Sequence, residues 1–84
     1  MTAEIEKHLA VDSLLDEAWA ARLRDYDVVL NKGKQALTLA RAQDYPLGIV
    51  RALNAIAWGY NRKAQHDLAA NHANEALHIA RQHH

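Results

Sequence analysis

The stretch that decides the fold is ALTLAR at residues 36–41, because it returns almost unchanged as ALHIAR at residues 76–81. The two copies are 40 positions apart (76 − 36). The same spacing pairs further identical residues: Arg22 with Arg62, Asp27 with Asp67, and Asn31 with Asn71. A period of about 20–50 residues is typical of stacked supersecondary units, none of which can bury its apolar face alone. The chain is therefore predicted to contain two copies of one unit.

Composition indicates that each copy is helical. The 84 residues include one Pro and three Gly, with abundant Ala and Leu and few β-branched residues, and such a chain has a high helix propensity nearly throughout. We predict an all-α fold of four helices, paired antiparallel into two helix-turn-helix units and forming one domain over residues 1–84. The predicted helices span 3–23, 27–42, 46–64 and 67–82, with unit one at about 3–43 and unit two at about 46–82.

The second unit carries the clearest helix signals. Pro46 suits the first position of a helix, where its missing N–H is not needed. Apolar side chains then recur at helical spacing on one face: Ile49, Leu53, Ile56, Ala57, Tyr60 and Ala64. Asp67 is predicted to be the N-cap of the last helix, and Asp27 of its counterpart in unit one. Small residues dominate both of these helices, and Gly33 in mid-helix predicts close approach of a neighbouring helix.

The first helix has two possible starts. Ser13 followed by Asp16 resembles a capping box, which would leave residues 1–11 as a separate arm. Alternatively, one helix runs from about Ala3 to Leu23, since Ile5, Leu9, Leu15 and Trp19 are spaced for it. We favour the single long helix.

These patterns together resemble the tetratricopeptide repeat. In that family the first helix of a unit carries large residues, a small residue and an aromatic, and the second carries a ladder of alanines. The matching positions in unit two are Leu53, Ile56, Ala57, Tyr60, Ala69, Ala73 and Ala76. Unit one fits through its Arg24-Asp25-Tyr26-Asp27 turn, but its upstream helix has Ser13, Asp16, Glu17 and Ala20 where large or small apolar residues are expected. The resemblance covers about residues 12–82 and implies a helical superhelix.

The resemblance also implies a groove lined by the first helices, which holds a peptide or a partner's helix. Carried over to unit two, the partner-binding residues would be Arg51, Asn54, Trp58, Asn61 and Arg62. Amide, guanidinium and indole groups suit peptide recognition. The alternative is that these residues are simply the solvated face of an amphipathic helix. In unit one the same positions hold Val11, Leu14, Ala18 and Ala21, which are apolar and therefore need a cover.

Two units are fewer than the roughly three that a repeat stack needs to bury a continuous core. The last helix has more apolar residues than one neighbour can cover. We therefore expect either a homodimer or a following domain that caps the stack. The possible self-association surface consists of Leu14, Trp19, Leu68, Leu77 and Ile79.

Other functions are disfavoured by composition. Ten basic and ten acidic residues give no net charge, which argues against nucleic acid and membrane partners. His66, His72 and His78 recur every six residues, about 240° apart on a helix, so no metal site is expected, and no cofactor either. There is no Cys and a single Ser, so we expect no catalytic site, hence no enzyme in this chain alone. Acids in place of a basic, apolar leader predict a cytoplasmic protein. His83 and His84 are either native or the remnant of a tag.

The expected function is that of a protein–protein interaction module. A period near 40 resembles that of bacterial regulators in which such repeats precede a signalling domain such as a diguanylate cyclase. The sequence thus predicts the regulatory or dimerising part of a larger signalling protein. The competing hypothesis is a closed four-helix bundle that senses a small molecule.

Overall fold

The computed structural model describes the backbone of residues 2–83 and the side chains of residues 8–83. It is all-α, as predicted, with four helices in antiparallel succession: α1 Thr2–Ala20, α2 Tyr26–Ala42, α3 Pro46–Arg62 and α4 His66–Gln82. The first helix is continuous, which confirms the favoured single helix through Ser13 and excludes the alternative of a separate N-terminal arm. The side chain of Ile5, one of the residues on which the long helix was predicted, and His84 lie outside the described residues.

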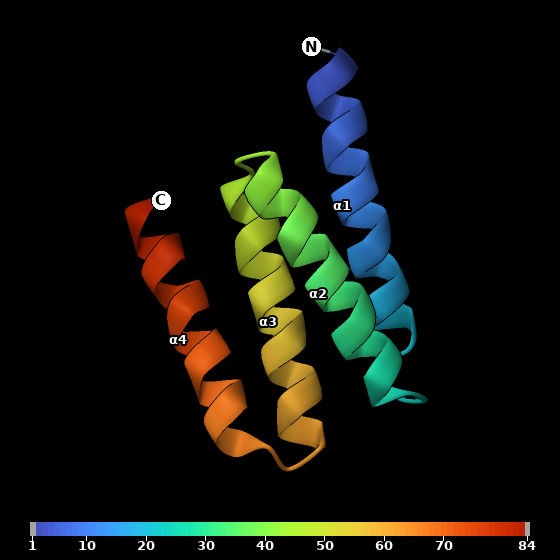
Figure 1. The fold of residues 1–84 in the computed structure, drawn as a ribbon, viewed down its shortest axis with the longest axis vertical. Helices are drawn as coiled ribbons and strands as arrows, with labels where there is room; N and C mark the ends of the chain where they lie inside the picture. Colours follow the sequence, from blue (N-terminus) through green and yellow to red (C-terminus); the bar gives the residue numbers. More distant parts are fainter. Residues whose placement is uncertain (1, 84) are drawn as a thin grey trace.

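The four helices form an open stack (Figure 1). Each helix packs against the next one in the chain, and α1 also packs against α3. Over residues 2–83, α1 and α4 lie at opposite edges and make no contact, whereas a closed four-helix bundle would bring its first and last helices together. None of the helices described is long and apolar enough to cross a membrane.

α3 begins at Pro46 as predicted, and α2 and α4 each begin one residue before the predicted start. Asp25, not Asp27, is the N-cap of α2, and its carboxylate accepts the backbone N–H groups of Asp27 and Val28. Asp67 likewise lies inside α4, whose N-cap Gln65 makes no side-chain cap hydrogen bond. Asp27 and Asp67 each lie in the first turn of their helix, where the helix dipole favours negative charge.

Two matching turns follow α2 and α3. Each is a Schellman motif whose left-handed residue is not glycine: Asp44 has φ 51° and Ala64 has φ 61°. In the second turn the N–H of Gln65 donates to the carbonyl of Tyr60, and that of Ala64 to Asn61. The third helix therefore ends at Arg62 rather than at the predicted residue 64.

Replacing Ala64 by Gly is expected to stabilise the fold by about 1 kcal/mol, because a left-handed backbone is strained with a Cβ and unstrained without one. For a domain of this size that corresponds to a rise in Tm of about 4–8 °C, measurable by circular dichroism. The control is Ala70→Gly, an exposed position inside α4, where glycine is expected to cost about 1 kcal/mol. A destabilised Ala64→Gly variant would contradict this account of the turn.

The first helix follows the repeat with a different offset from the rest. The starts of α2 and α4, Tyr26 and His66, are 40 residues apart, but the ends of α1 and α3, Ala20 and Arg62, are 42 apart. The cause is the turn between the paired helices, which has five residues at 21–25 and three at 63–65. This longer turn also ends α1 at Ala20, not at the predicted Leu23. A shift of two residues rotates a helix by about 200°, and so exchanges its faces.

With this offset, the buried apolar positions of α1 match those of α3. Val11, Leu14, Leu15 and Ala18 take the places of Leu53, Ile56, Ala57 and Tyr60. Val11, Ala18 and Ala21, which the sequence placed toward the groove, are 0–5% exposed in the core, and Leu14 is half-buried. That assignment was wrong for unit one, because the extra turn residues were not recognised. The cover that these apolar residues require is supplied by the chain itself.

Small residues set the helix spacing, as predicted for Gly33. A Cβ added at Gly33 would lie 3.0 Å from Cγ1 of Ile56 on α3. One added at Gly59 would lie 2.9 Å from Cδ2 of Leu30 on α2. The two glycines therefore allow α2 and α3 to cross in close contact, with a large side chain of one helix over each glycine of the other.

Candidate functional site

A groove runs between α1 and α3 and encloses about 410 Å³. Its lining combines apolar, amide and guanidinium groups: Leu15, Trp19, Arg51, Asn54, Ala55 and Trp58. Three of the five predicted partner-binding residues, Arg51, Asn54 and Trp58, are thus brought together here. Leu15 and Trp19 of α1 complete the lining, and neither residue was predicted to lie in the groove.

Aromatic rings form one end of the groove. The rings of Trp19 and Trp58 meet edge to face, with centroids 5.7 Å apart and planes at 66°. Tyr26, at the start of α2, also meets Trp58 edge to face, with centroids 5.8 Å apart and planes at 72°. Edge-to-face pairs of this kind are worth about 0.5–1.5 kcal/mol beyond their buried area. The two indoles therefore hold each other in place, although Trp19 is 49% exposed.

Two guanidinium groups lie on these rings. The Cζ of Arg22 is 4.7 Å from the ring centroid of Trp19. The Cζ of Arg62 is 5.7 Å from the centroids of both Tyr26 and Trp58. Such cation–π contacts fix the side chains while leaving the charges available at the protein surface. Arg62 is therefore beside the groove, in contact with its aromatic end, and not part of the lining.

Away from the aromatic end of the groove, an ion pair joins α1 and α3. Nη1 of Arg51 on α3 donates to Oδ1 of Asp12 on α1 at 3.0 Å, and the hydroxyl of Tyr45 donates to the same oxygen at 3.2 Å. The ring of His8 stacks on that of Tyr45 at 3.7 Å. Burial, followed by the nearby Asp12 carboxylate, raises the pKa of the Tyr45 phenol. Asp12 thus orients Arg51, which keeps further N–H donors for a ligand.

Asn61, the remaining predicted partner-binding residue, lies apart from the groove. Oδ1 of Asn61 is 2.8 Å from Nδ1 of His66, so its amide is engaged at the turn between α3 and α4. Trp19 of α1 occupies the corresponding place in unit one when the offset of 42 is applied. The unrecognised length of the turn at 21–25 is why the sequence placed Val11 and Ala18, and not Trp19, toward the groove.

The predicted self-association residues do not form one surface. Trp19 lines the groove, whereas Leu14 lies between α1 and α2 beside Leu39. Leu68 and Leu77 of α4 are both exposed, but nine residues at about 100° each place them on opposite sides of the helix. Ile79, which is half-buried, lies on the side of Leu68. The apolar excess of α4 is therefore divided between two faces.

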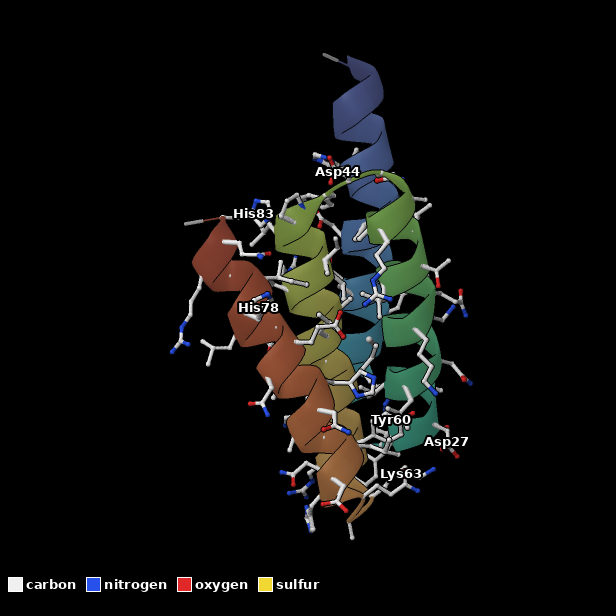
Figure 2. All side chains as sticks on the ribbon, turned by 60° about the vertical axis from the view of Figure 1, so that its left-hand side comes forward. Asp27, Asp44, Tyr60, Lys63, His78 and His83 are labelled. Atoms are coloured by element: carbon white, nitrogen blue, oxygen red, sulfur yellow. The ribbon has the colours of Figure 1, made fainter. Side chains whose placement is uncertain are left out.

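No group of three or more potential metal ligands occurs within the part of the chain that the structure describes. His72 and Tyr60 lie close together between α4 and α3, with ring centroids 5.4 Å apart. His78 projects from α4 and is linked to Gln82 one turn later (Figure 2).

The chain was compared with protein-family models, with curated proteins and with solved structures, and it matches none of them.

Proposed function

We propose that this protein is an interaction module that binds an extended peptide of a partner protein in the groove between α1 and α3. The observation that carries the proposal is the pairing of Trp19 with Trp58 across the groove, beside the exposed amide of Asn54. Paired indoles supply a rigid anchor for an apolar side chain, and an amide can bond a peptide backbone through both of its polar atoms.

The charges around the groove favour an acidic peptide. Arg22 and Arg62 lie on the indoles, and Arg51 lies in the lining, where it pairs with Asp12. The six lining residues include no carboxylate. A surplus of positive charge steers and orients ligands of opposite sign. We propose a ligand in which an apolar side chain packs on the indoles and a neighbouring carboxylate meets a guanidinium.

The resemblance to tetratricopeptide repeats supports the same function, since those repeats bind peptides in the corresponding groove. The period near 40 extends the proposal to a cytoplasmic regulatory module of a larger bacterial signalling protein, with a domain such as a diguanylate cyclase as its neighbour. The open stack favours this proposal over the small-molecule sensor, which would need a closed interior between four helices.

The test uses a library of random peptides displayed on phage, selected against the full chain. Both tryptophans of the chain line the groove, so intrinsic fluorescence reports its occupancy directly. We expect selected peptides to share an acidic residue next to an apolar one, to bind with micromolar Kd and to shift the emission. Asn54→Glu should lower the affinity of these peptides about tenfold, because it adds a negative charge among the lining residues.

The matched control is Asn71→Glu, the same change at an exposed position on α4. It should leave peptide affinity unchanged. Peptides that bind without shifting tryptophan emission and that tolerate Asn54→Glu would show that the groove is not the binding site.

A further inference from the structure

The outer side of α4 is open where the same side of α2 is covered. On α2, Leu30 is 7% exposed and Gly33 is buried, both beneath α3. Their counterparts 40 residues later, Ala70 and Ala73, are exposed, and Leu77 on the same side is 49% exposed. The internal repeat therefore shows what a covered version of this face looks like.

On α2 the cover is α3, and its contacts are specific. Ile56 packs over Gly33, and Gly59 makes room for Leu30. At the far end of α3 the ammonium of Lys63 pairs with the carboxylate of Asp27, as Figure 2 shows at the lower end of the stack. The counterpart of Asp27 on α4 is Asp67, which is exposed and has the same place in the first helical turn.

A pocket at the other end of α4 extends the comparison. It encloses about 340 Å³ between α3 and α4 and is lined by Pro46, Leu47, Val50, Ala80 and His83. In unit one the corresponding place is filled by Tyr45, which stacks on His8 and whose N–H donates to the carbonyl of Ala40 at 2.9 Å. The offset of 42 relates His8 of α1 to Val50 of α3, and the offset of 40 relates Ala40 of α2 to Ala80 of α4. The pocket is thus a matched place for an aromatic side chain.

We infer that this face of α4, with the pocket beside Val50, binds an amphipathic helix of another polypeptide in the way that α2 binds α3. The partner helix carries an aromatic residue just before its first turn, which enters the pocket. It carries a basic residue just after its last turn, which pairs with Asp67. Charge complementarity at one end and an apolar pocket at the other fix the direction of the helix.

Side-chain sizes specify the partner further. Ala73 has the Cβ that Gly33 lacks, and a Cβ at Gly33 would lie only 3.0 Å from Ile56, so the partner needs a smaller residue than Ile at that position. Ala70 replaces Leu30, whose Cδ2 is what excludes a Cβ at Gly59. The partner therefore has room for a large apolar residue where α3 has Gly59. The α4 face therefore selects a helix that has a small residue where α3 has Ile56 and a large one where α3 has Gly59.

The test adds synthetic peptides to the full ¹⁵N-labelled chain. One peptide has the sequence of residues 44–63, and a second carries Ile56→Ala and Gly59→Leu. We expect the second peptide to shift the amide signals of Ala70, Ala73 and Ala80 and to bind at least tenfold more tightly than the first. Its alanine at position 56 avoids the overlap with Ala73, and its leucine at position 59 fills the space above Ala70. Tyr45→Ala in that peptide should weaken binding about tenfold by emptying the pocket.

Two variants of the chain isolate this face. Ala73→Glu places a charge at the crossing on an exposed helical position and should abolish peptide binding, whereas Asn71→Glu should not. Asn54→Glu should leave the binding of the helical peptide to α4 unchanged, so the result is independent of the groove between α1 and α3. Equal affinity of the two peptides, or no shift on α4 at about 1 mM peptide, would overturn the inference. Dimerisation of the unliganded chain that Ala73→Glu abolishes would also overturn it, since a second copy would then be the occupant.

Discussion

Replacing Leu53 by Ala is expected to lower the free energy of unfolding by about 3 kcal/mol. Leu53 is completely buried on α3, the helix that contacts all three others. Truncation of such a side chain removes its transfer free energy and leaves a cavity, which together cost about 2–5 kcal/mol. A domain of 84 residues has a small core, so this loss is a large part of its stability.

Urea denaturation followed by circular dichroism measures the effect, with the slope m checked for a change in the two-state transition. Leu47→Ala is the matched control, because Leu47 lies on the same helix and is 60% exposed. We expect this control to change the free energy of unfolding by less than about 0.5 kcal/mol. Equal effects of the two substitutions would contradict the described core.

Replacing Gly33 by Leu is expected to be as damaging, for the opposite reason. Gly33 lies where α2 and α3 cross, and a Cβ alone would lie 3.0 Å from Cγ1 of Ile56 and 3.8 Å from the carbonyl oxygen of Ala52. A leucine side chain has no room there and must separate the helices. Overpacking of this kind costs about 1–3 kcal/mol, and we expect the upper end because backbone as well as side chain must move.

The smaller substitution separates packing from helix propensity. Gly33→Ala gains about 1 kcal/mol of propensity and displaces Ile56 by a few tenths of an ångström, so its net effect should be small. Asn31→Leu introduces the same leucine at an exposed position on α2 and should be close to neutral. Thermal denaturation of the three variants checks the order. A Gly33→Leu variant as stable as Asn31→Leu would show that the helices do not cross closely.

These two substitutions also bear on function, since α3 contributes to the groove and α2 supplies Tyr26 to its aromatic end. Separation of α2 from α3 would displace Tyr26 from Trp58. Loss of the binding signal in such a variant therefore reports a change of fold. The test of the groove accordingly uses Asn54, whose side chain is exposed and outside the core.

Prediction from the sequence was most successful where one helix could be interpreted by itself. Pro46 begins α3 as expected, Gly33 lies at a close helix crossing, and the starts of α2 and α4 keep the predicted spacing of 40. The ends of α2 and α4 agree with prediction, whereas α3 ends two residues before the predicted residue 64, because Ala64 adopts a left-handed turn without the glycine that usually marks it.

The site was predicted only in part. Arg51, Asn54 and Trp58 lie together in the groove, but the sequence placed Val11 and Ala18 beside them instead of Leu15 and Trp19. Tyr26 and Asp12 were missed, since each acts across a helix boundary: Tyr26 packs on Trp58, and Asp12 pairs with Arg51. Contacts between separate helices leave no periodic signal in either of them.

By itself, the sequence determined an all-α chain and predicted two copies of one helix pair, because the spacing of apolar and small residues is a local property of each helix. Only the tertiary structure decided which residues of α1 line the groove and which side of α4 stays open. The physical reason is the turn at residues 21–25, which is two residues longer than its counterpart and rotates α1 by about 200° relative to the repeat. That rotation buries Val11 and brings Trp19 to Trp58, a result that depends on how two helices meet.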